Sequence, residues 1–127
     1  MDYSIAKECT FLSEQEKITF PEVVQRLAKA EIEFYYADLV AQSKTYYGKH
    51  EAFVIPCLKN LEKEGDHQFN ADKVAEAIRL IQMGKIQYQE FLQRIIKAGV
   101  VAYFVFIQGC KALYLGKLGE QYIENFP

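Results

Sequence analysis

The sequence lacks the features that identify the common enzyme and metal-binding classes. It contains no glycine-rich phosphate loop, no dinucleotide-binding fingerprint and no nucleophile elbow. Its three cysteines, Cys9, Cys57 and Cys110, are far apart, and no histidine pair lies near them to complete a zinc site. We therefore expect no cofactor and no metal site, and any catalysis would use an arrangement outside these motifs.

Strong charge and long hydrophobic runs are also absent. The net charge is −2 with acids and bases interspersed, so no basic stripe is present to bind the phosphates of a nucleic acid. No run approaches the roughly 18 apolar residues of a membrane span, and the acidic N-terminal segment does not resemble a targeting peptide. An odd number of dispersed cysteines is typical of a reduced protein. These features predict a cytoplasmic protein without nucleic-acid or membrane partners.

The composition is that of a single globular domain over residues 1–127. Half of the residues are hydrophobic and a quarter are charged, which suffices to bury a core without metals or disulfides. Four further local signals predict helix ends. Ser4 and Asn70 are expected to cap the starts of two helices, while Gly84 and Gly99 are expected to end helices in the left-handed conformation.

The segment after residue 18 predicts a helix followed by a β-hairpin. Thr19-Phe20-Pro21-Glu22 is a capping box, in which Thr19 and Glu22 exchange hydrogen bonds with each other's backbone amides. The residues that follow place an apolar side chain at every third or fourth position, which is the pattern of an amphipathic helix. Alternating residues over 32–36 predict a strand. Residues 42–44 form a polar break, and Thr45 to Tyr47 form a second strand that ends at Gly48.

A similar segment occurs later in the chain. Residues 20–48 align with residues 88–116 without a gap, and the predicted helix faces coincide. Two of the identical pairs, Gln25/Gln93 and Arg26/Arg94, fall on the polar side of the helix, where burial does not dictate the residue. Two interpretations stay open. The chain contains an internal duplication, or two helix-plus-strand units share the pattern because the same physics shaped both.

These observations predict an α+β fold. Two pseudo-repeated helix-plus-β-hairpin units, residues 20–56 and 88–126, share one mainly antiparallel sheet, with a helical linker over 57–87 and helices packed on the sheet. Val100 to Ile107 is apolar at every position, so we expect a central strand that is covered on both faces. The strand with Glu33 and Asp38 should be more exposed. Thr45 to Tyr47 or Tyr122 to Phe126 should be sheet edges, which makes a homodimer possible.

Several short motifs occur in a fixed order along the chain: Phe20-Pro21, Tyr46-Tyr47-Gly48, Gln82-x-Gly84-Lys85, Ala98-Gly99-Val100 and Ile123-Glu124-x-Phe126-Pro127. In these motifs the chain resembles the YbcV-like proteins of bacteria and phages, a small family of unknown function whose members are sometimes called phage envelope proteins. The resemblance spans nearly the full length and implies an α+β fold without an established activity. Members often have glycine where Glu31 stands, and a second glycine in the region that here reads Lys49-His50-Glu51.

The two aligned segments differ at positions that suggest a site. Tyr36, Asp38, Tyr47 and His50 align with Phe104, Phe106, Leu115 and Leu118, so the first segment carries the polar group each time. On strand alternation Tyr36 and Asp38 share a face, and we expect Tyr46 or Tyr47 to lie across from them.

Three interpretations of Tyr36, Asp38, Tyr46, Tyr47 and His50 stay open. The tyrosines could stack a planar ligand, with Asp38 or His50 at its polar edge. In an enzyme, Asp38 or His50 would be the general base and a tyrosine the proton donor. Alternatively, these are solvated residues at strand ends. The favoured function is a noncatalytic binding or accessory module for a small planar ligand or a protein partner.

Overall fold

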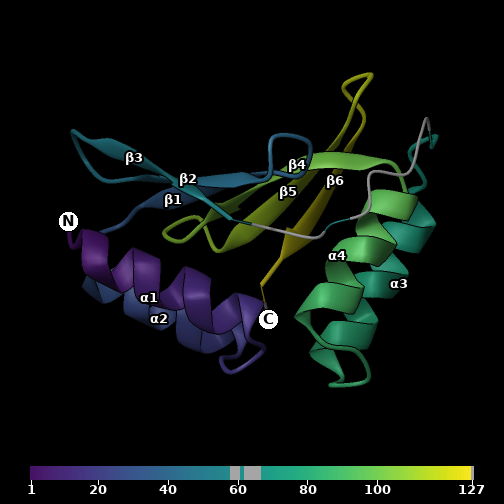
Figure 1. The fold of residues 1–127 in the computed structure, drawn as a ribbon. Coiled ribbons are helices and arrows are strands. Elements are labelled where there is room, and N and C mark those ends of the chain that lie inside the picture. Colours follow the sequence, from purple (N-terminus) through teal and green to yellow (C-terminus); the bar gives the residue numbers. More distant parts are fainter. Residues whose placement is uncertain (58–60, 62–66, 127) are drawn as a thin grey trace.

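The computed structural model describes residues 1–57, 61 and 67–126. Four helices pack on one face of a six-stranded sheet, which confirms the expected α+β fold (Figure 1). The elements, in chain order, are α1 (Tyr3–Glu14), α2 (Phe20–Lys29), β1 (Phe34–Asp38), β2 (Ser43–Tyr47), β3 (Ala52–Pro56), α3 (Ala71–Gln82), α4 (Tyr88–Lys97), β4 (Val100–Phe106), β5 (Lys111–Gly116) and β6 (Gln121–Asn125). The part of the expected linker over 58–60 and 62–66 lies outside the described residues.

The sheet is antiparallel throughout, with the strand order β3-β2-β1-β4-β5-β6. Strands β1 and β4 form its centre, so the expectation that β4 is central is confirmed. The expectation that Thr45 to Tyr47 form an edge is wrong, because β3 pairs with β2 and is itself the edge. At the other side β6 is the edge, as expected, and within the described residues it pairs only with β5.

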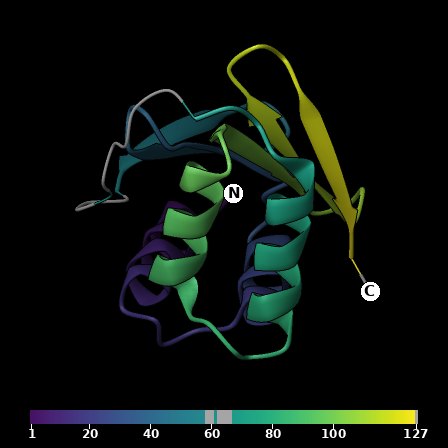
Figure 2. The same ribbon diagram turned by 90° about the vertical axis from the view of Figure 1, so that its right-hand side faces the viewer.

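All four helices lie on the same side of the sheet, as two views at right angles show (Figures 1 and 2). The other side carries no second layer in the described part of the chain. The expectation that β4 is covered on both faces is therefore wrong for the single chain. The apolar pattern that led to this expectation is present in the strand, since β4 reads VVAYFVF and has no polar residue apart from one tyrosine. The apolar residues on its uncovered face stay without a layer over them.

Local signals explain the helix ends. Thr19 and Glu22 form the predicted capping box, and Asn70 caps α3 through its side chain. Gly99 has φ +90°, which confirms the left-handed end of α4 and explains why a residue without Cβ stands there. The expected cap Ser4 is wrong by two residues, because Asp2 accepts from the Ser4 amide and begins α1.

The two halves of the chain have the same order of two helices and three strands, with α1 and α3 included. Backbone hydrogen bonds recur at corresponding positions of the two halves. The bond from Asp2 N to Ala30 O (3.1 Å) corresponds to the bond from Asn70 N to Ala98 O (2.8 Å). The bond from Leu39 N to Val101 O (3.0 Å) likewise corresponds to the bond from Ile107 N to Glu33 O (3.1 Å). Tyr36 and Phe104 pair directly at the junction of the halves. The halves are thus related by an approximate two-fold axis through this pair, and their common origin stays a prediction.

The core lies between the sheet and the helices. Its largest fully buried side chains come from both halves: Tyr46, Leu27, Ile32, Leu92, Ile95, Val74, Val105 and Cys9. Burying an aliphatic side chain of this size contributes roughly 1.5–3 kcal/mol, so this layer is the main source of stability. The opposite face of the sheet is where surface chemistry can be found.

Candidate functional site

The uncovered side of the sheet, called the open face below, is a grid of three rows across the six strands. Its rows follow the strand register and contain Pro56, Ser43, Asp38, Ala102, Leu115 and Gln121; Val54, Thr45, Tyr36, Phe104, Leu113 and Ile123; and Ala52, Tyr47, Phe34, Phe106, Lys111 and Asn125. Only one acid and one base occur among them. A solvent-facing sheet surface usually alternates to polar residues, so this face is unusually apolar.

Aromatic rings form the centre of the open face. The Phe34 ring stacks on Tyr47 with centroids 4.4 Å apart and lies 5.9 Å from Phe106. Phe104 continues the cluster, at 4.8 Å from Tyr36 and 5.5 Å from Phe106. The rings cover one another laterally, so each is partly buried although no layer of the described chain lies above it. This is one contiguous aromatic surface.

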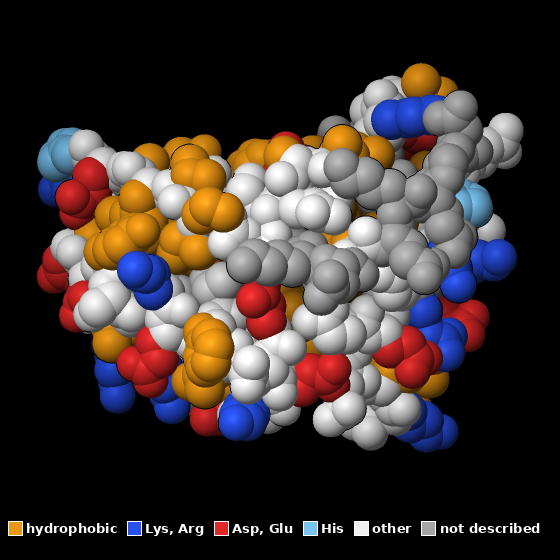
Figure 3. Space-filling model, in the orientation of Figure 1, with side chains coloured by type: hydrophobic (Ala, Val, Ile, Leu, Met, Phe, Trp, Pro, Cys, Tyr) orange, Lys and Arg blue, Asp and Glu red, His pale blue; other side chains and the backbone are white. Residues whose placement is uncertain are grey.

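Aliphatic side chains extend this surface toward both edges of the sheet. Val54 on β3 is 57% exposed and Ile123 on β6 is 51% exposed. In a view along the sheet, hydrophobic side chains follow the upper rim of the molecule, on the side away from the helices (Figure 3). Large contiguous apolar patches on soluble proteins commonly mark interaction sites.

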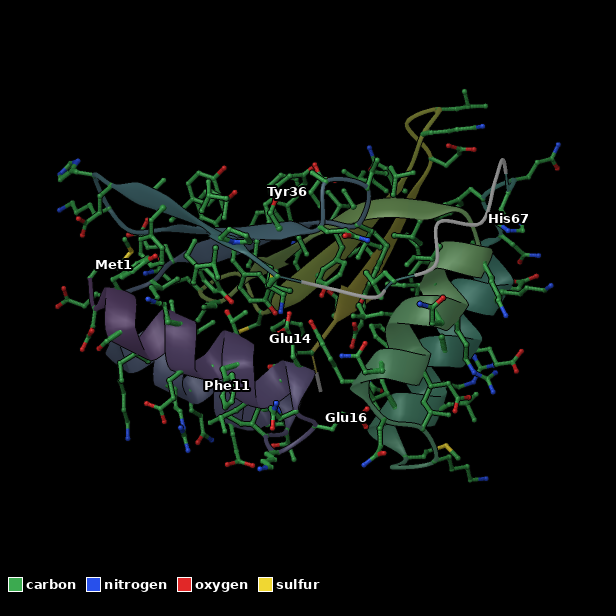
Figure 4. All side chains as sticks on the ribbon, in the orientation of Figure 1. Met1, Phe11, Glu14, Glu16, Tyr36 and His67 are labelled. Carbon is green, nitrogen blue, oxygen red and sulfur yellow. The ribbon has the colours of Figure 1, made fainter. Side chains whose placement is uncertain are left out.

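Three of the predicted site residues, Tyr36, Asp38 and Tyr47, lie on the open face, and Tyr36 projects away from the helices (Figure 4). The expected hairpin register is wrong. Tyr36 pairs with Thr45 and Asp38 with Ser43, whereas Tyr47 lies across from Phe34. The strand begins two residues earlier than the polar break suggested, which shifts the tyrosines along the hairpin.

Asp38 has a structural role at the end of β1. Its Oδ1 accepts hydrogen bonds from the backbone amides of Val40 (3.0 Å) and Ala41 (2.8 Å), which fixes the turn into β2. Burial, followed by the nearby Asp38 carboxylate, raises the pKa of the Tyr36 hydroxyl. Tyr36 is therefore a neutral phenol at physiological pH, able to donate a hydrogen bond and poorly suited to act as a base.

Tyr46 lies on the opposite side of the sheet from the other predicted residues. Its ring is buried beneath the helices, and its hydroxyl is hydrogen-bonded to the Thr10 hydroxyl of α1 at 2.7 Å. Because neighbouring residues of a strand face opposite ways, Tyr46 and Tyr47 cannot share a site. Tyr46 connects α1 to the sheet within the core.

His50 lies in the turn between β2 and β3, at the end of the hairpin remote from Asp38. Asp38 pairs with Ser43 at the start of β2, while His50 follows Tyr47 at its end. His50 instead lines a depression of about 470 Å³ with Met1, Glu31 and Glu51. The Met1 ammonium lies 3.4 Å from a Glu51 oxygen there. The structure does not bring His50 and Asp38 together.

The sequence interpretation missed a buried lysine. Lys44 lies in β2 on the helix side, is only 4% exposed, and holds its ammonium 5.6 Å from the Tyr35 ring and 5.1 Å from the Tyr88 ring. Assigning residues 42–44 to a polar break hid it. The available signal was its spacing of two from Tyr46, which places both on one strand face.

The environment of Lys44 is an enclosed polar cluster. Burial disfavours its charged form, but the surrounding tyrosines, a cysteine and Glu14 outweigh burial and raise the pKa of Lys44. Glu14 projects from α1 toward the sheet (Figure 4). Burial raises the pKa of the Cys57 thiol to about 11, so it is protonated and a poor nucleophile at neutral pH. We interpret this cluster as a polar part of the core, because Lys44, Tyr46 and Cys57 are all buried.

Metal clusters and membrane-spanning helices are both absent from the described part of the chain. No group of three or more metal-ligating side chains occurs within residues 1–57, 61 and 67–126. Within the same residues, no helix has the length and hydrophobicity to cross a membrane.

The chain matches a protein family whose function is unknown. The family described as "Protein of unknown function (DUF1398)" matches residues 8–125, and the chain belongs to it. This confirms the expectation of an uncharacterised family, while the finer likeness to YbcV-like proteins stays a prediction. No curated protein matches the chain.

Proposed function

We propose that this member of the DUF1398 family is a noncatalytic binding module that holds a protein partner on its open face. The observation that carries the proposal is the central aromatic surface of Phe34, Tyr36, Tyr47, Phe104 and Phe106, which no other part of the described chain covers. Aromatic residues are enriched and charged residues depleted at the centres of protein interfaces. The likeness to YbcV-like proteins agrees with this proposal but supplies no activity.

The shape of the open face favours a protein over a small planar ligand. Small-molecule sites are concave and enclose most of their ligand. The aromatic rings here lie on the flank of a sheet, where a planar ligand could cover one or two rings and would stay open to water on its other side. A protein surface can cover all three rows at once and exclude water from the rings, so it gains far more from the same residues.

The geometry gives little support to an enzyme using Asp38 and His50. Acid–base catalysis requires its groups within hydrogen-bond reach of one substrate. Asp38 is engaged by two turn amides, and His50 lies at the other end of the hairpin. The three cysteines are unpaired, which is consistent with work in the reducing cytoplasm, and we include that location in the proposal.

Photo-crosslinking tests the proposal. A benzophenone amino acid is placed at Phe104 on the open face and, as a matched control, at Phe11, which is 58% exposed on α1. Both variants are irradiated in the cells that naturally produce the chain. We expect discrete protein adducts from position 104 and several-fold fewer from position 11. Adducts that are absent, or equal at the two positions, would refute the open face as a protein-binding surface.

A further inference from the structure

The open face carries two charges of opposite sign, and their arrangement is informative. Asp38 pairs with Ala102 on β4, and Lys111 pairs with Phe106 four residues further along the same strand. Phe104 therefore lies midway between the acid and the base. With no other charge in the three rows, the face is neutral and does not repel a copy of itself.

This arrangement is self-complementary under two-fold symmetry. Consider a second open face laid on the first, with a two-fold axis between them that passes over Phe104 and runs perpendicular to the line from Asp38 to Lys111. Such an axis exchanges the two ends of that line. Asp38 of each copy then faces Lys111 of the other, and the two Phe104 rings meet at the centre. Closed two-fold interfaces of this kind are the commonest way in which identical chains associate.

The size of the open face is sufficient for a specific dimer. Strands about 4.8 Å apart and a rise of about 3.4 Å per residue give six five-residue strands a footprint on the order of 500 Å². Side chains make the accessible surface larger than its footprint, so two copies would bury on the order of 1,000 Å² or more, which reaches the size that a specific interface needs. Sheets pack face to face about 10 Å apart, a gap that lysine and aspartate side chains can bridge.

The sequence of β4 also indicates a second cover. The run Val100 to Phe106 has the continuous apolar pattern of a strand buried on both faces, yet in the described part of the chain the helices cover one face only. A second copy would complete the environment for which this strand is suited. The net charge of −2 adds little repulsion between two whole chains.

We propose that a second copy of this chain covers the open face in a two-fold symmetric, sheet-on-sheet dimer. In this dimer Asp38 of each copy pairs with Lys111 of the other, around a contact between the two Phe104 rings. The inference rests on the proposed function, because it identifies the partner that the open face holds. It differs from a dimer formed through the sheet edges, since it leaves β3 and β6 unpaired with another chain.

Sedimentation velocity over a range of protein concentrations tests the dimer. The wild-type chain should sediment as a species with twice the 14.7 kDa mass of one chain. Lys111→Glu should raise the dissociation constant at least about tenfold, since it places an acid opposite Asp38 at both ends of the interface. Adding Asp38→Asn to Lys111→Glu should restore part of the loss, because Asn removes the repelling charge and keeps the turn acceptor. Lys73→Glu on α3 is the charge-matched control and should leave the constant unchanged.

Three results would overturn the dimer. They are a wild-type chain that stays monomeric at every concentration, a dimer that Lys111→Glu and Lys73→Glu affect equally, and a double variant no tighter than Lys111→Glu alone. Lys111 is exposed in the single chain, so its substitution should leave the fold intact, which circular dichroism checks. The crosslinking experiment separates the two proposals. Adducts from position 104 at a mass other than twice the chain would retain the binding function and reject the second copy.

Discussion

The two halves of the molecule share their backbone plan and differ in the polarity of their cores. Beneath β2 the first half buries Lys44 and the hydrogen-bonded pair of Thr10 and Tyr46. At the place of Lys44 in the second half stands Ala112, which is also buried. The plan of two helices and three strands therefore does not require a buried lysine. The open face behaves differently, because both halves place aromatic residues at its centre, which is what a shared binding surface would require.

Alkaline pH should remove the stability of both halves together. Burial first, and then neighbouring groups, raise the pKa of Tyr35, Tyr103 and Tyr114 well above the usual 10.0. A raised pKa in the folded state contributes stability below the unfolded value and loses it as pH rises. We expect the free energy of unfolding to fall steadily above about pH 10. Phenolate absorbance of these buried tyrosines should rise together with the loss of helical circular dichroism, and ionisation in a fully folded chain would contradict their burial.

Exchanging the core residues tests the difference between the halves directly. Ala112→Lys should cost about 3 kcal/mol or more, because it forces a long side chain and its ammonium into a buried site that an alanine now fills. Lys44→Met keeps the length of the side chain and removes its charge, so it should change stability by less than about 1.5 kcal/mol. Urea denaturation measures both. Equal losses for the two variants would show that the groups around Lys44 do not stabilise its buried ammonium.

Glycine at the end of α4 should be indispensable. At Gly99, where φ is +90°, a Cβ would lie 2.7 Å from backbone atoms of Gln68 and Phe69. Gly99→Val should therefore cost about 3 kcal/mol or more, combining a left-handed β-branched residue with a clash against backbone.

Two other left-handed positions calibrate the Gly99 result. Gly84→Val is the matched control, since Gly84 has φ +70° and open space around it, so it should lose clearly less. Glu31, the counterpart of Gly99 in the first half, is left-handed with φ 63°, so Glu31→Gly should be neutral or slightly stabilising. Equal losses at Gly99 and Gly84 in thermal unfolding would show that the clash contributes nothing.

A small effect is expected at Asp38. Asp38→Ala removes the acceptor for the Val40 and Ala41 amides and should cost about 1 kcal/mol. Asp38→Asn keeps that acceptor and should cost less than about 0.5 kcal/mol. Comparing both at a protein concentration low enough to keep the chain monomeric isolates the turn. A loss of several kcal/mol in the Asn variant would show that the carboxylate charge itself stabilises the fold.

Local sequence signals predicted the fold well, and long-range pairing decided the rest. The capping box of Thr19 and Glu22 and the left-handed Gly99 depend on neighbouring residues only, so they could be recognised directly. Strand alternation correctly placed Tyr36 and Asp38 on one face. The register of β1 with β2 could not be predicted, because no strong turn motif fixes the hairpin.

The remaining errors have the same origin. A lysine beside two polar residues is normally exposed, so Lys44 was assigned to a break. Only the packing of β2 under α1 shows that it is buried. The candidate site was thus found in part, with Tyr36, Asp38 and Tyr47 on the correct surface. The rest of the open face comes from β4 and β5. A comparison that looks for polar residues does not find this part, because Phe104 and Phe106 are apolar.

The most direct test of the account is solvent access to the centre of the open face. The chain has no tryptophan, so Phe104→Trp introduces a single fluorescent reporter there and Phe11→Trp provides the control. Acrylamide quenching is measured as the protein concentration rises. The account predicts that the indole at position 104 becomes shielded and its emission shifts to shorter wavelength as copies associate, while the indole at position 11 stays accessible. An indole at position 104 that remains as accessible as the control at every concentration would contradict a second copy on this face.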